Sequence, residues 1–171
     1  MEFTQAEKKE IEYLRTRYSD ARSLTLPLMW MIQKREGHVS DEAVYLIAEE
    51  LNLPPIWVEE VRSWYSMFTK EKEGKYVLEV CNNISCSLLG NQEIIDYLCD
   101  KLKIKIGETT KDGMFTLKTA ECLGSCGTGP MMQIGDNYYE LLDEDEIDKI
   151  LQDLRNGKEQ DQQPQKFPEY K

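Results

Sequence analysis

Hydrophobic residues recur at helical spacing along the first 70 residues of the chain. Four segments there show an apolar face with a spacing of three or four residues, which predicts four short amphipathic helices packed as a small bundle. The apolar positions, in order, are Ile11, Leu14 and Tyr18; Leu24, Leu28, Met31 and Ile32; Val44, Ile47, Ala48 and Leu51; and Trp57, Val61, Trp64, Tyr65 and Phe68. We expect the aromatic side chains to form the core of the bundle. The alternative is a docking surface, since Trp and Tyr also anchor interfaces.

Residues typical of helix ends mark the limits of these segments. Thr4 with Glu7 has the capping-box pattern of a helix start. Gly37 fits the end of the second helix, whose Pro27 is compatible only with the first turn. The third helix should begin at Ser40 or at the next residue.

Beyond the polar segment 70–75 the period changes to the alternation of a strand. We expect strands over residues 76–80, 114–120, 131–134 and 138–141, and helices over 94–102 and 143–154, in the order β-α-β-β-β-α. The first two strands flank a helix and should therefore be parallel. The turn at 135–137 predicts an antiparallel hairpin for the last two.

This order of elements resembles the thioredoxin fold, and Pro130 stands where thioredoxins place a cis proline. Its isomer stays open at this point. We therefore expect an α/β protein with a helical bundle over residues 1–70 and a thioredoxin-like domain with a small mixed sheet over 71–156. The Gln-rich tail 157–171 has too little apolar content to fold and should be flexible.

The composition narrows the classes of function. The formal net charge is -11 and the Lys and Arg residues are scattered, which argues against nucleic-acid binding. No apolar run approaches the ~20 residues of a membrane span, and the N-terminus does not resemble a secretory signal. We expect a cytoplasmic protein, in which the five cysteines would be metal ligands or redox groups rather than structural disulfides.

Four of the cysteines follow the two strands that should be parallel neighbours. Cys81 and Cys86 come after the first strand, and Cys122 and Cys126 after the second. The carboxyl ends of adjacent parallel strands lie about 5 Å apart, so the four thiolates should converge on one metal centre. A redox disulfide and unrelated core cysteines are the alternatives. Cys99, on the apolar face of the intervening helix, is expected to be an inert packed thiol.

The spacing C-x4-C and C-x3-C favours an iron-sulfur cluster over zinc, which prefers paired C-x2-C knuckles. A Rieske centre needs two histidines, and the chain has only His38, which we expect at a helix end. Gly124, Gly127 and Gly129 would let the backbone approach the sulfides, or would simply serve turns. The chain shows no phosphate-binding loop and no dinucleotide fingerprint.

Three segments carry a resemblance to a known family: "VCNNISCSLLG", "GETTKDGMFTLKTAECLGSCGTGPMMQI" and the upstream "GHVSDEAVYLIAEELNLPP" followed by "WYSMF". They resemble the E-type subunits of bacterial NADH-quinone oxidoreductase, the family of the 24 kDa subunit of respiratory complex I. The resemblance implies a helical bundle, a thioredoxin-like domain and one [2Fe-2S] cluster. The ligands it implies are Cys81, Cys86, Cys122 and Cys126.

The same resemblance implies an electron-transfer subunit without a complete active site of its own. Its partner would be the flavoprotein subunit of the complex, which holds FMN and the NADH site, within the peripheral arm on the inner face of the plasma membrane. The alternatives are the equivalent diaphorase subunit of an NAD-linked hydrogenase or formate dehydrogenase, and a zinc-stabilised interaction module. A dithiol oxidoreductase would need a C-x-x-C motif at a helix start, which the chain does not contain.

Overall fold

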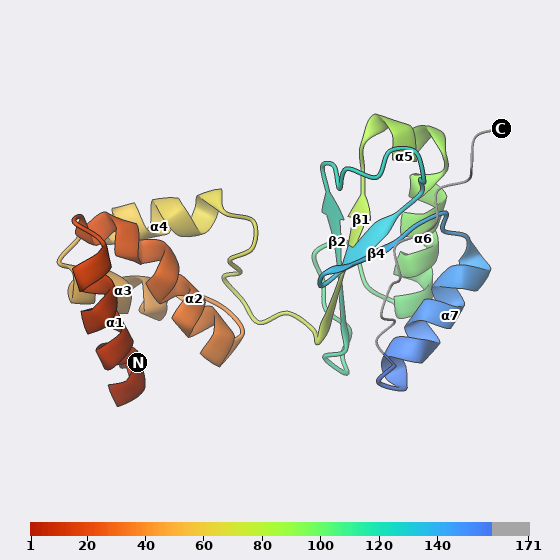
Figure 1. Ribbon diagram of the computed structural model, residues 1–171. Coiled ribbons are helices and arrows are strands. Elements are labelled where there is room, and N and C mark those ends of the chain that lie inside the picture. Colours follow the sequence, from red (N-terminus) through yellow and green to blue (C-terminus); the bar gives the residue numbers. More distant parts are fainter. Residues whose placement is uncertain (159–171) are drawn as a thin grey trace. The chain divides into compact units, whose positions relative to one another are not determined.

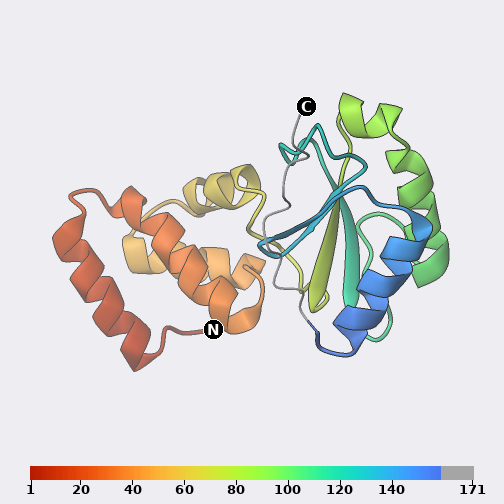
Figure 2. The same ribbon diagram turned by 45° about the vertical axis from the view of Figure 1, so that its right-hand side comes forward.

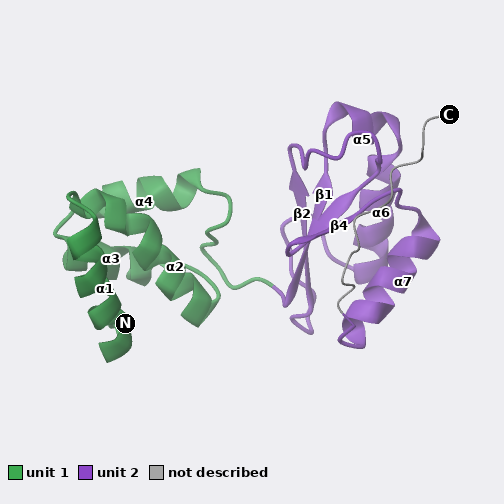
Figure 3. Ribbon diagram, in the orientation of Figure 1, with its two compact units in different colours: residues 1–73 green, residues 74–171 purple. Residues whose placement is uncertain are grey.

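The computed structural model describes residues 1–158. The chain divides into two compact units, Met1–Glu73 and Gly74–Lys171 (Figure 3). The expected tail 157–171 falls almost wholly outside the described residues. None of the helices in the described part of the chain combines the length and apolar character needed to cross a bilayer.

Unit 1 is helical, as its hydrophobic periodicity predicts (Figure 1). Its elements are α1 (Gln5–Arg17), the 3-10 turn η1 (Ala21–Leu24), α2 (Thr25–Glu36), α3 (Asp41–Leu51) and α4 (Pro55–Trp64). Pro27 lies in the first turn of α2, where it removes no helical hydrogen bond. Gly37 ends that helix with φ of 82°, a left-handed conformation that suits a residue without Cβ.

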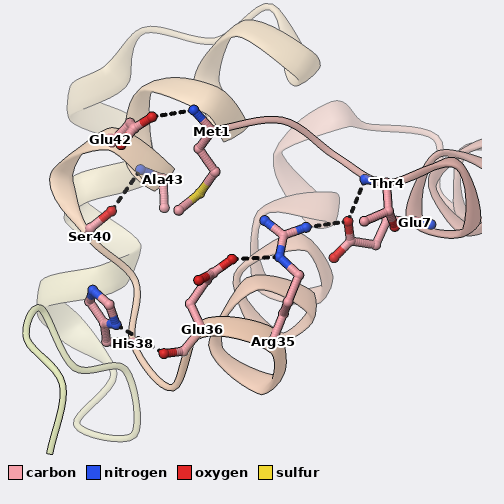
Figure 4. A network of polar contacts seen from close by, with 9 residues as sticks. All are labelled: Met1, Thr4, Glu7, Arg35, Glu36, His38, Ser40, Glu42 and Ala43. Carbon is pink, nitrogen blue, oxygen red and sulfur yellow. Dashed lines mark hydrogen bonds and ion pairs between the residues drawn. The ribbon is translucent and has the colours of Figure 1, made fainter.

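Side chains fix both the ends and the packing of these helices (Figure 4). The expected capping box is present: the Thr4 side chain accepts from the Glu7 N–H, and the Glu7 carboxylate accepts from the Thr4 N–H. Arg35 of α2 forms ion pairs with Glu7 and Glu36, so it ties the start of α1 to the end of α2. His38 lies at the end of α2, with Nδ1 3.2 Å from the Glu36 carbonyl oxygen.

The prediction that the aromatic residues form the core of the bundle is wrong for most of them. Trp57 and Trp64 are 40% and 81% exposed, and only Phe68 of the expected set is buried. The buried face of α4 instead carries Val58 and Arg62. The Arg62 guanidinium donates to the buried Val39 carbonyl oxygen at 2.8 Å, so a charged side chain lies on the buried face of α4.

Unit 2 contains a four-stranded mixed sheet in the order β2-β1-β3-β4. Its strands are β1 (Tyr76–Cys81), β2 (Phe115–Ala120), β3 (Met132–Ile134) and β4 (Asn137–Tyr139). β1 and β2 are parallel and β3 and β4 form an antiparallel hairpin, as expected. The peptide bond between Gly129 and Pro130, just before β3, is cis.

Three helices complete unit 2: α5 (Ile84–Leu88), α6 (Asn91–Leu102) and α7 (Glu144–Arg155). The order β-α-β-β-β-α is correct except that α5 was not expected. Figures 1 and 2 show α6 and α7 side by side on one face of the sheet. Their apolar faces and the inner face of the sheet enclose one core, which includes Leu78, Leu98, Phe115, Leu117 and Ile147. The fold is the expected α/β arrangement of a helical unit followed by a thioredoxin-like unit.

Candidate metal centre

The four cysteines of interest lie at one end of the unit 2 sheet. Cys81 is the last residue of β1, and Cys86 lies in α5 rather than in the open loop that the sequence suggested. Cys122 follows the end of β2 by two residues, and Cys126 lies four residues further on. Figure 1 shows the segment between β2 and β3 passing beside α5 at this end of the sheet. We call residues 82–89 the inner loop and residues 121–130 the outer loop.

Backbone and amide groups hold the two loops against one another. The Asn82 N–H donates to the Ala120 carbonyl oxygen at 2.8 Å, extending the β1–β2 ladder by one bond. The Asn83 side chain caps α5 and donates to the Glu121 carbonyl oxygen at 3.0 Å. These contacts bring the start of the outer loop to the start of the inner one.

The Cys81 thiol interacts with the thiols of both Cys86 and Cys122. Burial raises the pKa of the Cys81 thiol, but hydrogen bonds from the Asn83 and Leu123 N–H groups and from the thiols of Cys86 and Cys122 outweigh it, so that the pKa lies below its ordinary value. These donors stabilise a thiolate at Cys81. The interaction of Cys81 with Cys122 links the end of β1 to the outer loop.

Cys86 has the opposite tendency. Its burial, followed by its hydrogen bond to Cys81 and the charge there, raises the pKa of the Cys86 thiol to about 11. One thiol of the pair therefore keeps its proton when the other loses it, as expected for two close acidic groups. The Met131 N–H donates to the Cys86 sulfur and supports the deprotonated form.

Gly129 of the outer loop lies directly against the sulfur of Cys86. A Cβ added there would stand 3.1 Å from the Cys86 Sγ and 3.1 Å from the Leu89 Cδ1, closer than ordinary packing allows. No heavy atom beyond the chain neighbours lies within 4 Å of a Cβ built at Gly124 or Gly127, and Gly124 has φ of 83°. The expected close approach of the backbone to a cysteine sulfur is therefore found at Gly129. Gly124 instead serves a turn, since its positive φ is a conformation that residues with a Cβ rarely adopt.

The two cysteine pairs differ in exposure. Cys81 and Cys86 are 2% and 1% exposed and pack with Met131, whereas Cys122 and Cys126 are exposed. Within residues 1–158, no three His, Cys, Asp or Glu side chains are arranged to hold a single metal ion. What the site offers is four thiols: Cys81 at the end of β1, Cys86 in α5, and Cys122 and Cys126 in the outer loop. This donor set is the one that a [2Fe-2S] cluster requires, with two thiolates for each iron.

Cys99 lies apart from this site, on α6, where it is partly buried against the core of unit 2. Burial, followed by the charges of Asp96 and Asp100, raises the pKa of its thiol. A protonated, packed thiol fits the inert role that the sequence predicts. Two features of the site had no signal in the sequence: the short helix around Cys86 and the N–H donor of Met131.

Comparisons with known proteins show the family of the chain. Residues 11–155 match the family model of thioredoxin-like [2Fe-2S] ferredoxins. The chain is 39% identical over 148 residues to the E-type subunit 2 of NADH-quinone oxidoreductase of Rhizobium meliloti, covering 86% of this chain and 88% of that protein. It is 39% identical over 138 residues to NADH-quinone oxidoreductase subunit 2 of Thermus thermophilus, covering 80% and 76%.

Among solved structures, an NAD+-reducing [NiFe]-hydrogenase chain superimposes with a TM-score of 0.65 at 20% identity, over 80% of this chain and 24% of that chain. At this identity the similarity concerns the fold alone, and the present chain spans about a quarter of the hydrogenase chain. The assignment of the chain to a family therefore rests on the sequence matches. The chain therefore belongs to the thioredoxin-like [2Fe-2S] ferredoxins and, among them, to the E-type subunits of NADH-quinone oxidoreductase.

Proposed function

We propose that the chain holds one [2Fe-2S] cluster on Cys81, Cys86, Cys122 and Cys126. The observation that carries this proposal is the pairing of β1 with β2: Cys81 lies opposite Ala120 and the Asn82 N–H donates to the Ala120 carbonyl oxygen, so two cysteine segments some forty residues apart in the sequence begin at the same edge of the sheet. When bound, the cluster would supply one-electron oxidation and reduction. The protein's own groups would orient it: the N–H groups of Asn83, Leu123 and Met131 point at the ligand sulfurs and would stabilise their negative charge.

We further propose that the chain is an electron-transfer subunit of NADH-quinone oxidoreductase, without a complete active site of its own. Its partner would be the flavoprotein subunit of the complex, which would carry FMN and the NADH site and exchange single electrons with this chain. The names of the relatives in Rhizobium meliloti and Thermus thermophilus support the host complex. Other peripheral-arm subunits would hold the chain at the cytoplasmic face of the plasma membrane.

Exposed apolar side chains around the cysteine loops support docking at this end of unit 2. Ile84 and Leu88 of α5 are 71% and 83% exposed, and Leu89 and Leu141 are 52% and 60% exposed. Such a group beside two exposed cysteines suits a protein partner that brings a redox centre close to them. The flavoprotein is the occupant that we propose for this surface.

The test of the cluster is the analysis of the purified full-length chain. We expect two irons and two sulfides per chain and an electron paramagnetic resonance signal that appears only after reduction. Stoichiometric zinc without visible colour would overturn the proposal and favour a zinc-stabilised interaction module.

A second candidate within the same class is the diaphorase subunit of an NAD-linked hydrogenase or formate dehydrogenase. The superposition on the NAD+-reducing hydrogenase favours it, because the same fold occurs there as part of a longer chain. Purification from the native host separates the two. Recovery with quinone-reductase subunits supports the leading proposal, whereas recovery with a hydrogenase or formate dehydrogenase subunit replaces it.

A further inference from the structure

A half-buried carboxylate lies against the outer loop. Glu140 follows β4 directly, and its Oε1 accepts hydrogen bonds from the hydroxyls of Ser125 and Thr128. The two hydroxyl oxygens are themselves 2.7 Å apart. Ser125 immediately precedes Cys126 and Thr128 follows it by two residues. One carboxylate therefore holds the chain on both sides of the Cys126 ligand.

The backbone around Glu140 reinforces this attachment. The Leu141 N–H donates to the Thr128 carbonyl oxygen at 2.9 Å, and the Tyr138 hydroxyl donates to the Leu123 carbonyl oxygen at 2.8 Å. The end of β4 thus holds the outer loop at several points. The inner cysteines lie on a strand and a helix, whereas Cys122 and Cys126 lie in irregular backbone, which depends on such contacts for its conformation.

The charge of Glu140 has a separate consequence. Reduction adds one negative charge to a cluster, and a fixed negative charge nearby disfavours the reduced form. The carboxylate binds the two residues that flank Cys126, so it lies on the side of the exposed cysteine pair.

From these contacts we propose that Glu140 is a positioning residue for the outer loop, and that its charge lowers the reduction potential of the cluster. The inference rests on the proposed function, since it presupposes a cluster on the four cysteines. It has two separable parts. The hydrogen bonds of Glu140 keep the cluster in place, and its charge sets how readily the cluster accepts an electron.

The experiment uses the full-length chain with its cluster, compared with three variants and one control. Glu140→Gln keeps a hydrogen-bond acceptor and removes the charge, whereas Glu140→Ala removes both. The double variant Ser125→Ala with Thr128→Val removes the two donors and keeps the charge. Asp145→Asn, an exposed carboxylate in the first turn of α7, is the control for loss of one negative charge. The measurements are iron and sulfide content, the rate of iron loss to a chelator, and a redox titration followed by electron paramagnetic resonance.

For Glu140→Gln we expect full iron content and a more positive midpoint potential than in the control. The equilibrium constant for reduction should increase on the order of tenfold, which is about 59 mV for a one-electron couple. Glu140→Ala and the double variant should lose iron severalfold faster than Glu140→Gln. A midpoint potential equal to that of Asp145→Asn would overturn the electrostatic part, and unchanged iron loss in both Glu140→Ala and the double variant would overturn the positioning part. If the unmodified chain holds no iron, the proposed function itself fails, a result distinct from either of these.

Discussion

Cys81 lies directly opposite Ala120 in the register of the parallel strands β1 and β2. Because Cys122 comes only two residues after Ala120, the two cysteine segments begin at the same edge of the sheet. This register explains how thiols that are distant along the chain come into contact. It also separates Cys99, which lies on α6, from the other four cysteines.

Substitution of the cysteines tests the ligand assignment. Cys122→Ala should lose or degrade the cluster, because it removes one of the four proposed ligands. Cys99→Ser, which changes a partly buried thiol elsewhere in unit 2, should retain it. Iron and sulfide assays with electron paramagnetic resonance of the reduced proteins compare the two. Equal damage by both substitutions would contradict the assignment.

The close approach of Gly129 to Cys86 predicts sensitivity to added volume. Gly129→Val places a branched side chain where even one Cβ would stand 3.1 Å from the Cys86 Sγ. We expect overpacking to lower the free energy of unfolding by about 1–3 kcal/mol and to speed the loss of iron. The matched control is Gly127→Val, since no heavy atom beyond its chain neighbours lies within 4 Å of a Cβ there. Denaturant unfolding of both apo-proteins measures the difference, and equal effects would rule out the proposed crowding.

The exposed apolar group beside the cysteines predicts a specific effect on partner binding. Leu88→Lys introduces a charge that a partner would have to desolvate, so the affinity for the flavoprotein should fall by at least about tenfold, or ~1.4 kcal/mol. The control is Ile106→Lys, which changes another exposed apolar residue of unit 2, in the segment after α6. Binding is measured by titration of the flavoprotein with chains of equal iron content. An unchanged affinity for Leu88→Lys would move the docking surface elsewhere.

Asp148 of α7 contacts Tyr97 and Lys101 of α6, and its carboxylate should make the stability of the protein depend on pH in a defined direction. The Lys101 ammonium and then the Tyr97 hydroxyl hold the pKa of the Asp148 carboxyl below its ordinary value. A lowered pKa in the folded state contributes stability at neutral pH, and this contribution disappears as the pH falls through the folded pKa. Asp148→Asn should therefore lower the Tm of the apo-protein near pH 7, and its difference from the unmodified chain should shrink towards roughly pH 3.

Thermal unfolding followed by circular dichroism measures this difference across the pH range. Asp136→Asn, in the exposed turn between β3 and β4, serves as the control and should show little pH-dependent effect. A difference for Asp148→Asn that stays constant from neutral to acid pH would contradict the role of the carboxylate charge.

The two units should fold separately. The core of unit 2 is made of residues from Tyr76 to Leu154, and the core of unit 1 of residues from Phe3 to Phe68. A fragment of residues 74–171 should therefore take up the cluster and show the spectrum of the full-length chain. Cooperative unfolding of this fragment, measured by circular dichroism, is the expected result. A fragment that remains unfolded would show that unit 1 is required.

The spacing of hydrophobic residues and the residues typical of helix ends are sufficient to predict most of the fold. The Thr4 capping box, the Asp143 cap of α7 and the parallel pairing of β1 with β2 all follow from local residue patterns. Helix α5 could not be predicted, since five residues are too few to show a period. The outward-facing tryptophans were missed because helical spacing identifies a shared face but not the direction in which it points.

The sequence predicts the position of the cysteines in the candidate site but not the side chains and N–H groups around them. The convergence of the cysteine loops depends on strand order, which the pattern of the elements provides. The contacts of Glu140 with Ser125 and Thr128, and of Met131 with Cys86, join residues through tertiary structure and leave no local pattern. The isomer of Pro130 has no local signal either, because it too is determined by the surrounding fold.

The unequal burial of the two cysteine pairs bears on how the protein matures. Cys81 and Cys86 are held by a strand and a helix, so we expect half of the proposed ligand set to be organised before iron and sulfide bind. Cys122 and Cys126 are exposed and lie in irregular backbone, so we expect cluster insertion to alter the outer loop and to leave the sheet folded. The backbone amides of β1 and β2 should therefore be equally protected from hydrogen exchange in the empty and in the cluster-loaded chain.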